Sequence, residues 1–285
     1  MRLVQNPDFI TPHISDAHHL EIPWPSLAEN LTREIPLPRW APIHLGPLTV
    51  DLSPTKHVVM LLLAATIVTL VLVSAARSQA RRALSGSPPK GFANAIEAMV
   101  LYMRNEIILP NVGHHGEAFV PFCLTLFFFI LVCNLLGLLP WGSSATGNIS
   151  VTAVLAICSF IVVEIAGMRA LGKGYIKTIV YWPADVPFAV KAPVTLIMTP
   201  VELISKFTKP LALAIRLFAN MTAGHVLVLA LISLIFAFGS WFIVPFPLAA
   251  VTAIMMLEIF VAFLQAFVFT LLTSVFIGQI REGAH

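Results

Sequence analysis

Long apolar runs separated by short polar segments dominate this chain, and five of the runs are long enough to cross a membrane. An α-helix rises about 1.5 Å per residue, so about 20 apolar residues cross a hydrocarbon core of about 30 Å. The fourth run would reach roughly 70 Å as one helix, and we expect it to tilt steeply, bend or leave the membrane in part. The pattern predicts spans at residues 57–76, 119–139, 149–168, 193–238 and 248–280.

Two other segments are too polar to span. Residues 91–109 mix apolar with charged residues, which predicts an interfacial amphipathic helix. Residues 1–56 are polar and contain nine prolines, which prevent long helices, so we predict an extended, soluble N-terminal segment. The predicted fold class is an all-α membrane protein with five transmembrane helices and one interfacial helix, in which residues 57–285 form the membrane domain.

Composition and charge support this division and predict an orientation. Hydrophobic residues make up 58% of the chain and charged residues only 11%, whereas about a quarter of a soluble domain is charged. The net charge of +3 is too small to indicate a nucleic-acid partner. Lysine and arginine number four in residues 77–90 and four in 169–191, but none in 140–148 or 239–247. The positive-inside rule therefore places the N-terminus outside and the C-terminus in the cytoplasm.

Several patterns resemble metal, disulfide or phosphate-binding motifs but are not interpreted as functional sites. The three cysteines have the spacing of neither a metal site nor a disulfide framework. The histidines of the N-terminal segment lack a partner ligand at diagnostic spacing, so solvated histidines are preferred to a metal site. The run Gly167–Lys173 resembles a phosphate-binding loop, but Gly174 stands where that loop needs Ser or Thr. We therefore predict no metal and no cofactor.

Ionisable residues within the fourth run are the first candidates for function, because each costs about 2.5–3.5 kcal/mol at the bilayer centre. At about 100° per residue, five polar residues of this run fall on one stripe and His225 falls on the opposite face. Arg216 cannot release its proton at biological pH, which suits a permanent charge and not a proton carrier. The alternative is an arginine that snorkels to a headgroup. The stripe consists of Glu202, Lys206, Lys209, Arg216 and Asn220.

The last run adds two polar residues on one helical face, Glu258 and Gln265, which lie seven residues apart. His225 and Glu258 form a natural proton-handling pair, because imidazole titrates near neutrality and a carboxylate beside it keeps the proton mobile. The alternative is a static buried hydrogen bond between the two. For Gln265 the alternative is a polar contact between helices.

Three charged residues near the ends of the runs keep two interpretations each. Glu202 either serves a water-filled entrance at the cytoplasmic end of its helix or only pairs with Lys206, four residues on. Glu164 and Arg169 are interpreted as marking an interface, with a role in a channel as the alternative.

The segments K-P-L-A-L-A-I-R-L-F-A-N-M-T-A-G-H at residues 209–225 and L-Q-A-F-V-F at residues 264–269 are the most specific motifs of the chain. Both strongly resemble the signature of the ATP synthase subunit a family, and the order of apolar runs matches as well. The resemblance covers about residues 40–282. It implies a subunit beside a rotating ring of c subunits, with two offset half-channels through which protons reach the ring carboxylates. The residues implied in proton translocation are Arg216 and, around it, Asn220, His225, Glu258, Gln265 and Glu202.

Within that resemblance, Arg216 separates the half-channels and Glu202 belongs to the cytoplasmic one. His225 and Glu258 match the pair of the outer half-channel, with acid and imidazole exchanged relative to the best-studied bacterial pattern. The implied protein is a non-catalytic stator subunit in the bacterial inner membrane, and its long, tilted C-terminal helices face the c-ring. Peripheral-stalk subunit b, the rest of the ATP synthase and membrane lipid are its other implied partners.

Two other functions compete with this interpretation. A self-contained proton- or sodium-coupled secondary transporter often shows paired inverted repeats with broken helices, but only residues 193–238 are unusual and no second copy is evident. A structural scaffold predicts no ionisable stripe inside the membrane, whereas this chain has one.

Overall fold

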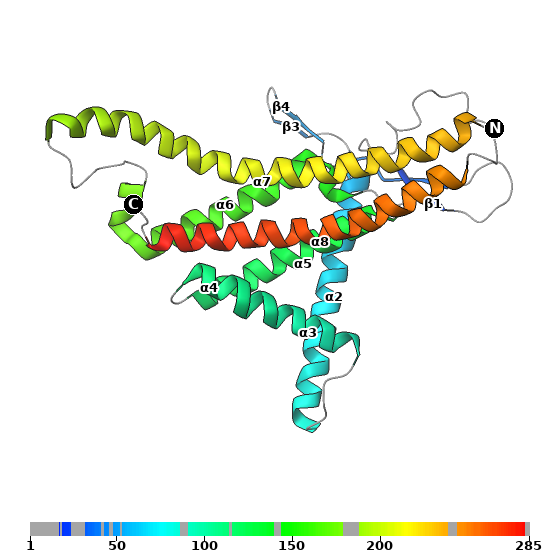
Figure 1. Ribbon diagram of the computed structural model, residues 1–285, viewed down its shortest axis with the longest axis horizontal. Coiled ribbons are helices and arrows are strands. Elements are labelled where there is room, and N and C mark those ends of the chain that lie inside the picture. Colours follow the sequence, from blue (N-terminus) through cyan, green and yellow to red (C-terminus); the bar gives the residue numbers. More distant parts are fainter. Residues whose placement is uncertain are drawn as a thin grey trace. The chain divides into compact units, whose positions relative to one another are not determined.

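The protein is described here from a computed structural model, whose elements are labelled in Figure 1. The residues that it describes are 17, 19–23, 32–40, 43–45, 48–51, 53–85, 91–113, 116–139, 144–178, 188–238 and 244–282. Among them, five helices are long and apolar enough to cross a membrane. The prediction of an all-α membrane protein with five long apolar helices is therefore confirmed.

The N-terminal segment forms two short antiparallel hairpins. Strand β1 (His19–Pro23) pairs with β2 (Thr32–Pro36), and β3 (Ile43–Leu45) pairs with β4 (Leu48–Val50). The sequence predicted extended chain here but not its pairing. Two histidines that were weighed as metal ligands, at positions 13 and 18, lie outside the described residues.

Three of the long helices begin close to the predicted bounds, and two of them also end close to them. Helix α5 (Val120–Gly137) and helix α6 (Ile149–Leu171) follow the second and third apolar runs. Helix α2 (Lys56–Ser85) begins as expected but continues nine residues past the end of the first run, through Arg77 and Arg81. Helices need no apolar residues once they leave the hydrocarbon, so a hydropathy boundary underestimates their length.

The predicted interfacial segment is helical but not one regular helix. It consists of α3 (Phe92–Tyr102), a π-helical turn η2 (Met103–Ile108) and α4 (Leu109–Val112). The 3-10 turn η3 (Gly116–Phe119) then leads into α5. Gly113, at φ 77°, ends α4 in the left-handed region that glycine adopts without strain. The location of this segment at the membrane interface stays a prediction.

The last two helices are the longest. Helix α7 (Phe188–Phe238) has 51 residues and helix α8 (Pro245–Glu282) has 38. Prolines 193, 200 and 210 lie inside α7 without ending it. Short 3-10 turns, η4 (Ala145–Gly147) and η5 (Gly172–Thr178), flank α6 on either side.

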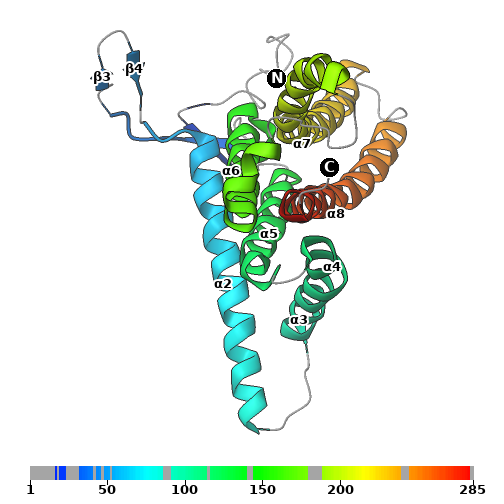
Figure 2. The ribbon, with the colours of Figure 1, turned by 90° about the vertical axis from the view of Figure 1, so that its left-hand side faces the viewer.

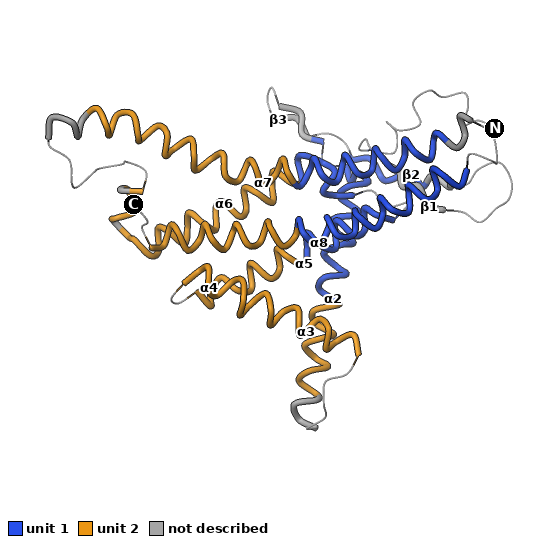
Figure 3. Tube along the Cα trace, viewed as in Figure 1, with its two compact units in different colours: residues 1–70, 129–151, 217–265 blue, residues 71–128, 152–216, 266–285 orange. Residues whose placement is uncertain are grey.

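The chain divides into two compact units, coloured separately in Figure 3. Unit 1 comprises residues 1–70, 129–151 and 217–265, and unit 2 comprises residues 71–128, 152–216 and 266–285. The long helices pass from one unit into the other, so each unit contains part of α7 and part of α8.

The core of unit 1 combines small apolar contacts with a buried polar chain. Ala64 on α2, Cys133 on α5 and Ala145 in η4 pack together. Beside them, the fully buried amide of Asn134 accepts a hydrogen bond from the Thr146 hydroxyl at 2.7 Å. The hydroxyls of Ser144 and Thr146 lie 2.7 Å apart and extend this series of buried hydrogen bonds. Because each group has a partner, the burial cost of these polar atoms is offset.

Unit 2 is held together at the C-terminal end of α8. Gly278 lies directly against the backbone carbonyl of Asn111 at the end of α4. The Arg281 guanidinium donates to the Val112 carbonyl at 2.9 Å and lies over the ring of Phe119. Figure 2 shows α4 beside the C-terminal part of α8. An orphan carbonyl at the end of α4 is thus satisfied by a cation, which also suits the negative end of the helix dipole.

Candidate functional site

Two amides that the sequence singled out meet in unit 1. Asn220 on α7 donates from Nδ2 to Oε1 of Gln265 on α8, at 3.1 Å. Gln265 is buried, whereas Asn220 is exposed on α7. The alternative interpretation of Gln265, a polar contact between helices, describes this geometry. Each hydrogen bond of this kind fixes the rotation of one helix about its axis relative to its neighbour.

The carboxylate of Glu258 lies against the turn of α7 that carries His225. A Cβ built on Gly224, the residue before His225, would overlap the carboxylate of Glu258. Glycine is therefore needed at this position for α8 to present Glu258 so close to the α7 backbone. Oε1 of Glu258 is buried and has no hydrogen-bond partner among the described residues. A buried carboxylate oxygen without a partner is expected to take up a proton or a water molecule.

Gly224→Ala is expected to lower proton conduction at least about tenfold, because the new methyl group displaces the Glu258 carboxylate by about 1 Å or more. Folding is expected to tolerate the change, since the displaced group ends a flexible side chain and alanine favours a helix. Passive proton flow into vesicles that contain the assembled ATP synthase measures the effect. Gly147→Ala is the matched control, because its Cβ would lie 3.6 Å from the Ser144 Cβ, an ordinary contact. Equal conduction in the two variants would contradict the assigned position of Glu258.

The buried polar chain of unit 1 also reaches the two functional helices. Asn134 donates from Nδ2 to the carbonyl of Ala262 on α8, at 3.3 Å and three residues before Gln265. The Thr222 hydroxyl on α7, two residues after Asn220, donates to the carbonyl of Gly147 at 3.5 Å. The sequence analysis did not predict these two contacts of Asn134 and Thr222. The signal available was Asn134 itself, a lone amide in the apolar run of α5.

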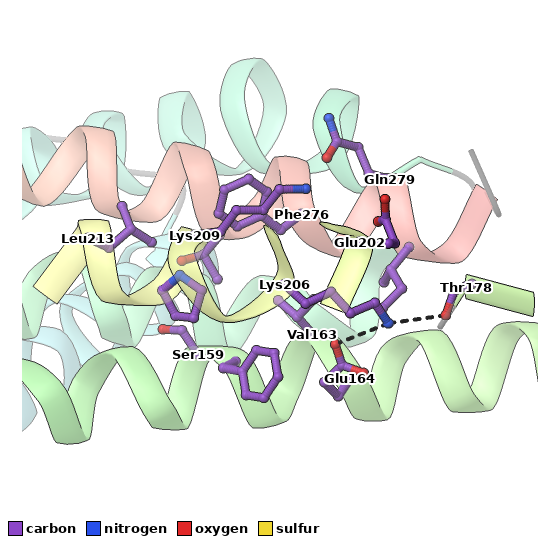
Figure 4. Close-up of a pocket in the computed structure, with 14 residues that line it drawn as sticks. Ser159, Val163, Glu164, Thr178, Glu202, Lys206, Lys209, Leu213, Phe276 and Gln279 are labelled. Atoms are coloured by element: carbon purple, nitrogen blue, oxygen red, sulfur yellow. Dashed lines mark hydrogen bonds and ion pairs between the residues drawn. The ribbon is translucent and has the colours of Figure 1, made fainter. Parts of the chain in front are cut away.

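Unit 2 contains a cavity of about 370 Å³ between α6, α7 and α8. Its charged lining residues are Glu164, Glu202, Lys206 and Lys209. A cavity of this size and polarity holds several water molecules. Figure 4 shows these side chains around the cavity. Glu202, predicted to serve a water-filled entrance, therefore lines a cavity that suits one.

Lys206 does not pair with Glu202 in this cavity. Its ammonium lies 3.6 Å from the carboxylate of Glu164 on α6 and donates to the Thr178 hydroxyl at 3.1 Å. It also lies over the ring of Tyr175, at 4.8 Å from the centroid. The interpretation that Glu202 only pairs with Lys206 is thus wrong. Glu164, interpreted as marking an interface with a role in a channel as the alternative, is part of the cavity wall.

Arg216 is exposed on α7 in an apolar setting. Leu211 and Ile215, the neighbours toward the N-terminal end of the helix, are large exposed apolar residues of 56% and 47% exposure. Asn220 follows four residues after Arg216, which puts the guanidinium and the amide on one face of the helix. An arginine in the middle of such a surface is costly in lipid, which makes Arg216 a candidate for function.

No group of three or more His, Cys, Asp or Glu residues that could hold a metal ion occurs in the part of the chain that the structure describes. Two long apolar helices that carry a cation, a pair of amides and two carboxylates are typical of membrane proteins that move ions.

Comparison with known proteins identifies the family of ion-moving membrane proteins to which the chain belongs. Residues 58–278 match the ATP synthase A chain family, so the chain belongs to that family. The chain is similar to ATP synthase subunit a of Chloroherpeton thalassium, at 46% identity over 240 residues that cover 83% of this chain and 70% of the relative. It is also similar to ATP synthase subunit a of Anaeromyxobacter dehalogenans strain 2CP-1, at 40% identity over 93% of this chain and 67% of the relative.

Membership of this family settles the general function. The chain is the Fo proton-channel stator subunit of a bacterial ATP synthase, a non-catalytic, multi-pass membrane protein. The competing interpretations, a self-contained secondary transporter and a structural scaffold, are therefore wrong.

Proposed function

We propose that Arg216 separates two proton half-channels and faces the carboxylates of a rotating ring of c subunits. The observation that carries this proposal is the exposed arginine on an apolar face of α7, four residues before Asn220 on the same helix. An exposed cation on a surface otherwise suited to lipid needs an anionic partner, and Arg216 has no ion pair among the residues that the structure describes. A membrane carboxylate on the neighbouring ring has the required charge.

The electrostatics of that encounter produce directional transfer. A ring carboxylate surrounded by lipid stays neutral, because burial disfavours its charged form. Opposite Arg216 the ionised form is favoured instead, and the proton leaves into one half-channel. The carboxylate is loaded again from the other half-channel before it re-enters lipid. The driving force is about 2.3 kcal/mol per proton for each 100 mV of membrane potential.

Two groups of residues serve as the half-channels in this proposal. Glu258 and His225 take protons from the outer side, and the buried, unpartnered Oε1 of Glu258 supports a carboxyl group that exchanges its proton. Glu202 passes protons at the cytoplasmic side, which the cavity beside it supports. The hydrogen bond between the amides of Asn220 and Gln265 keeps α7 and α8 in register.

The orientation and the partners of the chain complete the proposal. The distribution of lysine and arginine places the N-terminus outside and the C-terminus in the cytoplasm of a bacterial inner membrane. Residues 1–56 then form an external segment. Besides the c-ring, peripheral-stalk subunit b is proposed to contact this chain.

Passive proton conduction through vesicles that contain this chain with its ring tests the outer half-channel. Glu258→Gln and His225→Ala are each expected to reduce conduction by about tenfold or more, because a general acid or base typically contributes at least 100-fold to proton transfer. The matched control is Glu117→Gln, which removes an exposed carboxylate outside the proposed path. Unchanged conduction in both test variants would remove the assignment of His225 and Glu258 to the outer half-channel.

A further inference from the structure

Lys206 is the most heavily contacted cation of the unit 2 cavity. Its ammonium is held by the Glu164 carboxylate at 3.6 Å, by the Thr178 hydroxyl at 3.1 Å and by the face of the Tyr175 ring at 4.8 Å. The side chains of Lys206 and Glu164 are only 13% and 15% exposed, so water screens their attraction less than at an open surface. This ammonium therefore has a defined position away from its own helix.

The position of Lys206 is notable because a second acceptor lies one turn away on the same helix. Glu202 precedes Lys206 by four residues, and a glutamate at that spacing before a lysine is the favourable order for an ion pair on a helix. Glu202 nevertheless makes no ion pair with any of the residues that the structure describes. In Figure 4 the Glu202 carboxylate points away from the Lys206 ammonium, which is turned toward Glu164 and Thr178.

The remaining cation of the cavity is also directed away from Glu202. The Lys209 ammonium lies over the ring of Phe276 on α8, at 5.2 Å from its centroid. Two carboxylates, Glu164 and Glu202, balance the two ammonium groups of the cavity wall, so the cavity is not an anion site. Of the two carboxylates, that of Glu164 forms an ion pair with Lys206, and that of Glu202 is left open to the cavity.

We propose that Glu164 is a positioning residue that draws Lys206 away from Glu202 and so leaves the Glu202 carboxylate free to exchange protons. The inference rests on the proposed role of Glu202 in the cytoplasmic half-channel. A carboxylate paired with an ammonium holds a proton about tenfold or more weakly than a free one. Without Glu164, Lys206 turns back to the acceptor on its own helix, and the Glu202 carboxylate is then engaged in an ion pair and no longer open to the cavity.

If the proposal holds, loss of the Glu164 charge reduces proton flow more than loss of the Lys206 charge does. Glu164→Gln releases Lys206 onto Glu202 and is expected to lower ATP-driven proton pumping by about tenfold. Lys206→Gln removes the group that would block Glu202 and is expected to leave pumping within about twofold of the wild type. The double variant is expected to recover to the level of Lys206→Gln, because Glu202 has no ammonium beside it. Glu164→Asp keeps the charge and is expected to retain pumping.

The experiment uses the complete ATP synthase in vesicles, with pumping normalised to the amount of assembled complex. Wild-type pumping in Glu164→Gln overturns the proposal. A double variant no better than Glu164→Gln also overturns it, because Glu164 then carries protons itself. If the ion pair serves only to hold α6 against α7, Glu164→Gln and Lys206→Gln reduce assembly alike, which again overturns it.

Glu202→Gln separates this inference from the function on which it rests. Impaired pumping in Glu202→Gln together with normal pumping in Glu164→Gln refutes the positioning role alone. Normal pumping in Glu202→Gln refutes the proposed role of Glu202, and the positioning role fails with it. The asymmetric pattern, with Glu202→Gln and Glu164→Gln impaired and the double variant recovered, supports both.

Discussion

Arg216→Ala is expected to abolish ATP-driven proton pumping by the assembled ATP synthase. In the proposed mechanism the Arg216 charge favours ionisation of a ring carboxylate beside this part of α7, so in the alanine variant the carboxylate keeps its proton and the ring cannot unload. It also removes the positive potential that repels a proton from crossing directly between the half-channels. We therefore expect no ATP-driven acidification of vesicles, together with a proton leak that does not depend on ATP.

Two further variants show whether the position and the chemistry of this charge matter. Arg104→Ala is the control for loss of an arginine as such, since Arg104 forms an exposed ion pair with Glu117 at 3.6 Å and such pairs contribute about 0–1 kcal/mol. It is expected to pump as the wild type does. Arg216→Lys is expected to remain strongly impaired, because an ammonium lacks the planar, always-charged geometry of the guanidinium. Wild-type pumping by Arg216→Ala would refute the proposed separation of the half-channels.

The long helices were predictable because lipid offers no hydrogen-bond partners to the backbone. A backbone inside hydrocarbon must satisfy its own hydrogen bonds, so every apolar run of sufficient length becomes a helix. The same constraint explains why prolines 193, 200 and 210 do not end α7, although proline costs about 3 kcal/mol in a helix interior. What hydropathy did not predict was the helical chain beyond the apolar runs, such as the end of α2, and the hairpin pairing of the N-terminal segment.

The candidate site was predictable where residues share a helix and not where they belong to different helices. Helical spacing put Arg216 and Asn220 on one face, and the Asn220–Gln265 contact involves two residues that were both singled out. The partner of Lys206 was not predicted, because its neighbour on the same helix, Glu202, was visible in the sequence but the approach of α6 was not. The roles of Gly224 and Asn134 depend in the same way on which helices pack together.

Gly278→Ala is expected to cause a large loss of stability. The new Cβ would overlap the carbonyl oxygen of Asn111 and approach the Val112 Cα to 3.5 Å. Both are backbone atoms, so α8 and the end of α4 must separate, and overpacking of this kind costs up to about 3 kcal/mol. Alanine regains about 1 kcal/mol through its helix propensity. The net loss of about 2 kcal/mol corresponds to a fall of roughly 4–8 °C in the midpoint of thermal denaturation.

The separation caused by Gly278→Ala also has a defined local consequence. Arg281 follows Gly278 by three residues and donates to the Val112 carbonyl at 2.9 Å, so a shift of α8 breaks this hydrogen bond as well. Gly174→Ala is the matched control, because the nearest atom to its Cβ would be the Leu171 Cβ at 3.9 Å. Thermal denaturation of the two purified variants in detergent measures the difference. If both denature at the same temperature, α8 does not pack against the end of α4, and the close approach at Gly278 is not what holds the C-terminal part of unit 2 together.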